Sequence, residues 1–238
     1  MRVALTIAGT ITRWIFRLIL VTLIIDVVYV WQLWRQQPVT ELGPVPESRL
    51  IANQRARIGM AHWQPVAMHE IPDHVVRAVL IAEDARFYYH AGFDLTAIRS
   101  AIWANLQHRR LAYGASTISQ QTAKNLFLTP ERSWLRKWHE ALLTAALEVF
   151  VSKQRILEIY LNTAQFGSNV YGVEAAASYY WDKPVALLSL RQAAELAASL
   201  PAPSIANPRT RNLFFTQHSG KIHRRLLHVV SAKGAARL

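Results

Sequence analysis

Apolar residues recur along most of this chain at intervals of three and four positions, which is the spacing of one face of an α-helix. No stretch alternates apolar and polar residues for long enough to predict a sheet. The pattern therefore predicts an all-α domain. Its helices are expected to cover approximately Asp73–His90, Leu95–Gln107, Thr117–Leu126, Ser133–Val151, Ser152–Asn162, Val173–Tyr180 and Leu190–Leu200.

The most apolar stretch of the chain lies near its beginning, at Ile15–Trp34, and is long enough to cross a bilayer as a helix. Arg2, Arg13 and Arg17 precede or enter it, whereas only Arg35 follows it closely. Because positive residues favour the cytoplasmic side, we expect a cytoplasmic N-terminus and an exported domain. No small-x-small cleavage site follows the apolar stretch, which favours an anchor over a cleaved signal peptide.

Asp26 interrupts this apolar stretch, where an ionised carboxylate is costly. We expect it either to be protonated or to pair with a partner helix. The chain then divides into a cytoplasmic N-terminus at residues 1–14, a transmembrane anchor at 15–35, a Pro-rich linker at 36–48, the main domain at 49–208 and a basic C-terminal segment at 209–238.

Composition and charge exclude several classes of protein. Apolar residues make up 52% of the chain and charged residues 18%, which excludes a disordered chain, and the lack of cysteine excludes disulfides and thiolate chemistry. The formal net charge is +12, but residues 38–200 carry sixteen basic and fourteen acidic side chains, so the surplus lies at the two ends. A nucleic-acid-binding domain carries its surplus on the recognition surface. We therefore exclude nucleic acid as a partner and interpret the charge as membrane-facing.

A carboxylate interrupts the apolar face of the first predicted helix of the main domain. Burial of an ionised carboxylate is costly unless the group is paired or its pKa rises. Glu83 is therefore a candidate general base, and the alternative is a structural carboxylate that caps a neighbouring element or pairs with an arginine. The residues on this predicted face are Val76, Leu80, Glu83, Phe87 and His90.

A second candidate segment covers residues 114–125. Thr117 and Gln120 have the spacing of a capping box, which predicts that a helix begins here. Thr117, Gln121 and Lys124 then share one face. Free backbone N–H groups beside a hydroxyl, an amide and a lysine predict an anion site, and the alternative is an ordinary capped helix with a solvated lysine.

A third segment begins at Ser133 and again has a carboxylate within an apolar face. Arg136 and Glu140 lie one turn apart, on the face that Leu143 and Leu147 continue. An isolated Arg–Glu pair of this spacing stabilises a helix by only a few tenths of a kcal/mol. Two such helices around a cationic helix start favour a functional site over two unrelated structural carboxylates.

Four motifs run in order along the chain: Glu83-Asp84-x-x-Phe87-x-x-His90-x-Gly92-x-Asp94, Gly114-Ala-Ser116-Thr117-Ile-Ser-Gln120-Gln121-x-x-Lys124-Asn125, Arg136-Lys137-x-x-Glu140 and Arg155-Ile-Leu-Glu158-x-Tyr160-Leu-Asn162. In order and spacing they resemble the motifs of the peptidoglycan glycosyltransferases, which polymerise lipid II. The resemblance covers about residues 60–208. No Ser-x-x-Lys or Lys-Thr-Gly motif of a transpeptidase follows, so we expect the monofunctional kind.

The resemblance implies a lysozyme-like fold with two lobes and a cleft between them. It implies that Glu83 takes the proton from the GlcNAc 4-hydroxyl of lipid II while that oxygen attacks the growing chain, which forms a β-1,4 linkage with inversion and releases undecaprenyl diphosphate. Lys124, Arg136 and Lys137 would neutralise the departing diphosphate. Glu140, the second catalytic candidate, would either hold a divalent cation (Mg²⁺ or Mn²⁺) or orient these bases.

The resemblance also assigns supporting and substrate-binding residues and a location. The domain is expected on the periplasmic side of a bacterial inner membrane, held by a single-pass anchor. Expected partners are lipid II, the nascent glycan strand, membrane lipid and cell-division or elongation proteins. The supporting residues are Asp84, Phe87 and His90, and the substrate contacts are Ser116, Thr117, Gln120, Gln121 and Asn125.

Two further expectations concern charged residues of the fourth motif and of the C-terminal segment. Glu158 is expected to pair with Arg155 on its own helix. Lys221, Arg224 and Arg225 lie among apolar residues, which predicts an amphipathic helix that either faces lipid headgroups or packs on the domain.

Two other functions remain as alternatives. A lytic transglycosylase or muramidase would share the helices and an acidic residue but would cleave glycan, and it would not need a cationic cluster for a diphosphate. A non-catalytic cell-wall scaffold would have no reason to bury both Glu83 and Glu140.

Overall fold

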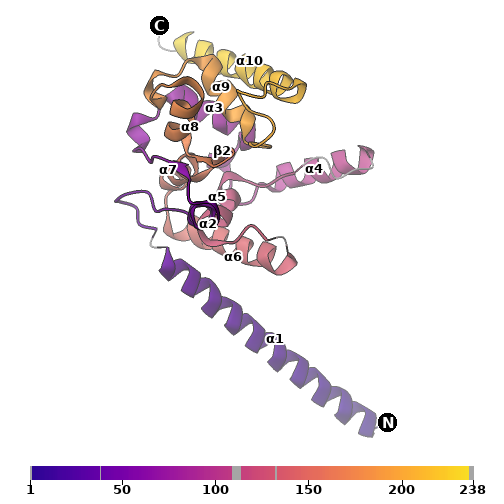
Figure 1. The fold of residues 1–238 in the computed structure, drawn as a ribbon. Coiled ribbons are helices and arrows are strands. Elements are labelled where there is room, and N and C mark those ends of the chain that lie inside the picture. The colour runs from indigo at the N-terminus through magenta and orange to yellow at the C-terminus, as the bar shows by residue number, and fades with distance from the viewer. Residues whose placement is uncertain (1, 38, 109–113, 132, 236–238) are drawn as a thin grey trace.

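The protein, seen in a computed structural model, consists of one long helix followed by a mostly helical domain (Figure 1). The structure describes residues 2–37, 39–108, 114–131 and 133–235. Parts of four predicted segments therefore lie outside the described residues: residue 1, residue 38, residues 109–113 and 132 of the main domain, and residues 236–238. The helices are α1 Arg2–Gln36, α2 Arg49–Ile58, α3 Asp73–Glu83, α4 Leu95–His108, α5 Ile118–Phe127, α6 Trp134–Phe150, α7 Lys153–Thr163, α8 Val173–Trp181, α9 Leu190–Ser199 and α10 Leu213–Ala235.

The predicted all-α class is confirmed, with one small sheet in addition. Its strands are β1 (His62–Trp63), β2 (Gln165–Gly167) and β3 (Val170–Tyr171), in the order β1-β3-β2, with β1 parallel and β2 antiparallel to β3. Strands of two or three residues are too short for an alternating pattern to be recognised in a sequence. Three single turns of 3₁₀-helix, at residues 68–70, 87–89 and 185–187, complete the secondary structure of the described residues.

The prediction of one helix over Asp73–His90 is wrong, because α3 ends at Glu83. The backbone leaves the helical region at Asp84, with φ −159° and ψ 76°. The carboxylate of Asp84 accepts hydrogen bonds from the backbone N–H of Ile118 and from His90, which draw the chain away from the helix axis. Phe87 and His90 therefore do not continue the helical face that carries Glu83.

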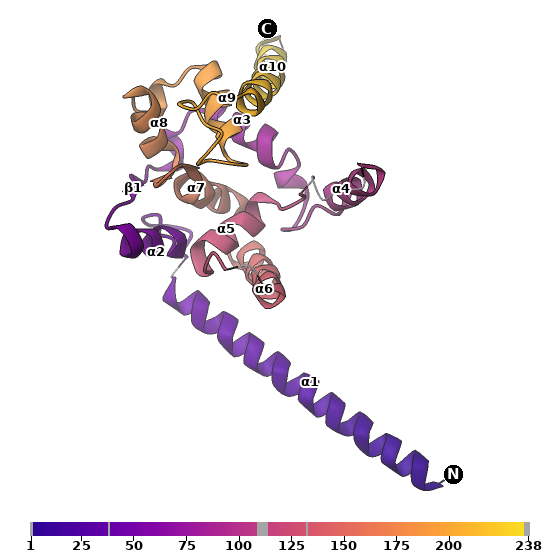
Figure 2. The same cartoon turned by 45° about the vertical axis from the view of Figure 1, so that its right-hand side comes forward.

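The helices form two groups, which correspond to the two lobes that were expected (Figures 1 and 2). Helix α3 packs on α9, and α10 packs on both. Helix α5 packs between α6 and α7, while α4 projects to one side of the domain in both views. Most residues of α5 and of α7 are buried, and α5 packs on both α6 and α7, so α5 lies at the centre of this group of helices.

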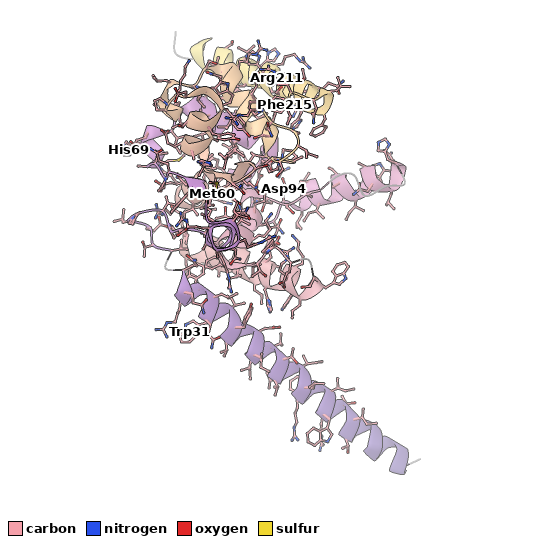
Figure 3. The ribbon with its side chains drawn as sticks, viewed as in Figure 1. Trp31, Met60, His69, Asp94, Arg211 and Phe215 are labelled. Carbon is pink, nitrogen blue, oxygen red and sulfur yellow. The ribbon has the colours of Figure 1, made fainter. Side chains whose placement is uncertain are left out.

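The C-terminal helix α10 packs on the domain. Phe215, which Figure 3 labels near the beginning of α10, is buried, and so are Ile222 and Leu226 further along the helix. Helix α10 packs on α3 and α9. Lys221 and Arg224 remain exposed on the other face. Both views place α10 at the end of the domain opposite to α1, so the interpretation of the C-terminal charge as membrane-facing does not fit this arrangement (Figures 1 and 2).

Helix α1 extends away from the domain and exposes most of its apolar side chains between Ile11 and Trp31. Residues Thr10–Gln36 have a mean hydropathy of 2.1 in their most apolar window and are long enough to cross a membrane. This indicates a single-pass membrane anchor. Trp31, which Figure 3 labels, lies near the end of α1 that adjoins the domain, where aromatic residues meet a membrane surface.

The anchor is joined to α6 through the carboxylate in its apolar stretch. Trp138 Nε1 donates a hydrogen bond to Asp26 Oδ2 at 3.1 Å, and His139 Nε2 lies 3.0 Å from Asp26 Oδ1. Near the end of the anchor, Trp34 stacks on Phe127 with ring centroids 5.5 Å apart. Of the two expectations for Asp26, the structure supports pairing, and the partner is a helix of the same chain.

Replacement of Asp26 by Leu should loosen the anchor, because both polar contacts with α6 are lost. Because the chain has no cysteine, cysteines introduced at the exposed positions Ile15 and Trp134 would be the only sites to which thiol-reactive spin labels attach. We expect the distance distribution between the labels to broaden in Asp26→Leu. Thr22→Val is the control, because the Thr22 hydroxyl bonds Leu18 within α1. Equally narrow distributions would show that the aromatic contacts alone hold the helix.

Candidate active site

A cavity of about 570 Å³ lies between α5, α6 and α7 and the segment that follows α9. Two residues that the sequence analysis did not select, Tyr160 and Gln165, also line it. The cavity therefore brings together most of the substrate-binding residues that were predicted from separate motifs. Those in its wall are Ser116, Gln121, Lys124, Asn125, Arg136 and Lys137, and the catalytic candidate Glu140 lines it as well.

Glu83, the last residue of α3, reaches this cavity through Gln121. Gln121 Nε2 donates a hydrogen bond to Glu83 Oε2 at 2.7 Å, and Gln121 is part of the cavity wall, whereas Glu83 lies behind it. Burial raises the pKa of the Glu83 carboxyl, while the hydrogen bond from Gln121 and the charge of Lys124 act in the opposite direction. Glu83 is thus a stronger base than an exposed glutamate, and its ionised form still accepts a hydrogen bond from Gln121.

The supporting residues Asp84 and His90 join the end of α3 to the start of α5. Ile118 N donates to Asp84 Oδ2 at 3.1 Å, and His90 Nε2 lies 3.0 Å from both carboxylate oxygens. The Thr117 hydroxyl donates to the Gly92 carbonyl at 2.6 Å. These bonds hold α5, and with it Gln121, against the segment that follows Glu83.

The predicted capping box at the start of α5 is confirmed. Gln120 N donates to Thr117 Oγ1 at 3.2 Å, and Thr117 N donates to Gln120 Oε1 at 3.0 Å. Both side chains are buried and neither lines the cavity. The N–H groups of Ile118 and Gln120 already have acceptors within the protein, so they are not free to bind an anion. Phe87 is also buried, under the ammonium group of Lys153 at 4.4 Å from its ring centroid.

Three cations, Lys124, Arg136 and Lys137, lie near Glu140 in the cavity wall. Arg136 Nη1 donates to Glu140 Oε2 at 3.0 Å, and Lys137 Nζ donates to Glu140 Oε1, while only 3% of the Glu140 side chain is exposed. Burial lowers the pKa of Lys124, and the charge of Glu140 opposes this shift. The cluster therefore presents positive charge to the cavity, with one carboxylate that balances part of it.

The residues present do not fit a divalent cation at Glu140. Both of its carboxylate oxygens accept from cationic side chains, which would repel a metal ion. Among the described residues, Asp84, His90 and Asp94 hold ligand atoms within 4.8 Å of one another, but both carboxylates already accept backbone N–H bonds, from Ile118 and Ala97. The divalent cation stays a prediction.

Tyr160, in α7, is the functional candidate that the sequence analysis missed. Its hydroxyl donates to Gln121 Oε1 at 3.2 Å, and its side chain is completely buried. It stands in the fourth motif, but a tyrosine within an apolar helix face carries no sequence signal that distinguishes it from a core residue. In the same motif, the predicted pair of Arg155 with Glu158 is confirmed, at 2.7 Å.

The fold and the site define a class of protein: a helical domain on an apolar anchor, in which a buried carboxyl group and a cationic cluster meet at one cavity. The chain belongs to the transglycosylase family, since the family model described as Transglycosylase matches residues 51–230. This confirms the resemblance that the four motifs carry.

Several relatives are described as biosynthetic peptidoglycan transglycosylases. One from Yersinia pseudotuberculosis (serotype O:1b) is 51% identical over 144 residues, which are 60% of this chain and 60% of the relative. One from Nitrosomonas eutropha is 43% identical over 209 residues, which are 84% of this chain and 83% of the relative. The chain thus spans 60% of the length of the Yersinia relative and most of the Nitrosomonas one.

Replacement of Glu140 by Gln should destabilise the domain, because Arg136 and Lys137 lose the charge between them. Lys137 is partly exposed, so we expect a loss of about 1–2 kcal/mol in the free energy of unfolding, below that of a completely buried pair. Chemical denaturation in detergent measures it. Glu131→Gln is the matched control, since it removes the same charge from an exposed position before α6. Equal stability of the two variants would contradict the proposed charge balance.

Proposed function

We propose that this protein polymerises peptidoglycan glycan strands, transferring the growing undecaprenyl-diphosphate-linked chain to the GlcNAc 4-hydroxyl of lipid II. The observation that carries the proposal is the meeting of Glu83, through Gln121, with the cationic cluster at one cavity. Membership of the transglycosylase family and the names of the relatives support it. This reaction needs a base for the acceptor and positive charge for the leaving group. The cations line the cavity, and Glu83 lies one hydrogen bond behind its wall.

Glu83 acts as the base in the proposed reaction. The acceptor oxygen forms a bond to C1 of the growing chain while its proton passes to Glu83, and the bond from C1 to the diphosphate breaks on the opposite face of the sugar. Attack opposite to the leaving group inverts C1, so an α-linked donor yields a β-1,4 linkage. A carboxylate whose pKa is raised by burial is a stronger base than an exposed one.

The cations stabilise the leaving group. Negative charge develops on the diphosphate as the bond to C1 breaks, and cations already in place lower the energy of that transition state. Lys124, Arg136 and Lys137 all line the cavity. Glu140 is the positioning residue for this group, because it holds Arg136 and Lys137 through its two oxygens.

The cationic cluster also favours polymerisation over the alternatives. A muramidase or lytic transglycosylase acts on glycan without a diphosphate, so the substrate would offer three cations at its cavity no diphosphate to neutralise. A scaffold would not require a buried carboxyl group at a cavity, since burial of that group is costly.

We also propose the orientation and the partners. The arginines before the anchor support a cytoplasmic N-terminus and a domain on the periplasmic side of the inner membrane. The substrates would then be lipid II and the nascent strand at the membrane surface. Cell-division or elongation proteins remain the expected protein partners.

Glu83→Gln should reduce polymerisation by about a hundred- to ten-thousandfold, because an amide cannot accept the proton. Fluorescent lipid II, incubated with the full chain in detergent and separated on a gel, measures the products. Because Glu83 must be ionised, activity should fall on the acid side, at a pH above the ordinary pKa of a glutamate. Normal activity of a folded variant would overturn the assignment.

The same assay tests two further points. Cleavage of preformed glycan by the unaltered protein would support a lytic enzyme. Chelation of divalent cations tests the predicted cofactor.

Lys124→Ala should slow the transfer by about ten- to a hundredfold, the effect expected for one charge-assisted hydrogen bond to the leaving group. The rate at saturating lipid II measures it. Lys183→Ala is the control, because Lys183 is exposed and lies outside the cavity. An unchanged rate in Lys124→Ala would exclude this lysine from the stabilisation of the diphosphate.

A further inference from the structure

A chain of hydrogen bonds joins α7, α5 and α3 behind the cavity. The Tyr160 hydroxyl donates to Gln121 Oε1 at 3.2 Å, and Gln121 Nε2 donates to Glu83 Oε2 at 2.7 Å. The Tyr160 side chain is completely buried. The amide of Gln121 therefore connects the buried hydroxyl of Tyr160, by two hydrogen bonds, to the carboxyl group that is the base in the proposed function.

The two orientations of the Gln121 amide are not equivalent. In the observed one, the tyrosine proton has an acceptor and the carboxylate has a donor. In the opposite one, the amide N–H would face the tyrosine oxygen, and the amide carbonyl would face Glu83. The Tyr160 proton would then lose its acceptor, since within the described residues Gln121 alone bonds this hydroxyl. A buried donor without an acceptor is costly, so Tyr160 disfavours that orientation.

Among the described residues, two charged groups face Glu83 and influence its pKa, and the effect of the uncharged Tyr160 adds to theirs. Lys124 faces it from α5 and favours the ionised carboxylate, whereas Asp84, next in the chain, disfavours it. Tyr160, from α7, carries no charge and contacts Gln121 rather than Glu83. Its influence on the carboxyl group therefore passes through the amide.

We propose that Tyr160 is a positioning residue that orients the side-chain amide of Gln121, so that its NH₂ group and not its carbonyl faces the carboxylate of Glu83. This inference rests on the proposed function, because that function assigns the role of base to the carboxylate. The hydrogen-bond relay itself does not depend on that role. In the presence of Tyr160, the carboxylate of Glu83 keeps a hydrogen-bond donor that opposes the rise of its pKa by burial.

The direct test is the pKa of Glu83 in the full chain in detergent, measured by NMR with ¹³C-labelled glutamate and assigned with Glu83→Gln. Tyr160→Phe keeps the ring and removes the hydroxyl, so we expect the pKa of Glu83 to rise by about half a unit to one unit. Tyr180→Phe is the matched control. It removes a hydroxyl that donates to the Phe166 carbonyl at 2.8 Å, and it should leave the pKa of Glu83 unchanged.

A second variant separates orientation of the amide from a general loss of structure. Gln121→Met removes the amide, so it should raise the pKa of Glu83 by itself, and Tyr160→Phe should add nothing in that background. An unchanged pKa in Tyr160→Phe, or an equal rise in the Gln121→Met background, would overturn the inference.

Polymerisation by the same variants tests the proposed function separately. If Glu83 is the base, the acid side of the pH–rate profile should move to higher pH in Tyr160→Phe by the same amount as the NMR pKa. A shift of the NMR pKa without a shift of the profile would support the role of Tyr160 and contradict the role of Glu83 as base.

Discussion

The hydrogen bond from the backbone N–H of Ile118 to the carboxylate of Asp84 joins the last residues of α3 to the first residue of α5. The turn at Asp84 ends α3 at Glu83, so the carboxyl group lies at a helix end instead of in the middle of an apolar face. The same bond sets where α5 begins, and therefore where Gln121, one turn further on, meets Glu83. His90, bound to both oxygens of Asp84, holds this junction from the following loop. The geometry at Glu83 thus depends on a residue that does not itself line the cavity.

Helix α6 connects the membrane anchor to the cavity. Its neighbouring residues His139 and Glu140 point to different partners: His139 binds Asp26 of α1, and Glu140 binds the cations of the cavity wall. Asp26 lies ten residues before the end of α1 at Gln36, which corresponds to about 15 Å along a helix. If α1 spans the membrane, α6 must therefore lie at the membrane surface or partly within it. A lipid-linked substrate could reach the cations from the membrane without leaving it completely.

The sequence allowed the helices and most of the cavity wall to be predicted, because both depend on local patterns. Apolar spacing and capping residues determine where α5 and α6 begin, and the motifs placed Lys124 and Glu140 on their inner faces. The end of α3 could not be predicted, because it depends on the bond between Asp84 and Ile118, which are far apart in the chain. Tyr160 was missed for the same reason, since its hydroxyl matters only once α7 lies beside α5. The position of α10 is likewise a result of packing and not of its own sequence.

The charges in the cavity wall give Glu140 a role that requires no metal. Burial and the charges of Arg136 and Lys137 all lower the pKa of Lys124, whereas the charge of Glu140 raises it. Without this carboxylate, three neighbouring cations would repel one another, and Lys124 would lose its proton more readily. With it, the charged form of Lys124 is favoured before a substrate arrives. For the proposed reaction this balance matters twice, because the cations must stabilise a departing diphosphate and then release it. A carboxylate that shares two of the cations lowers their net attraction for the product while keeping all three in place.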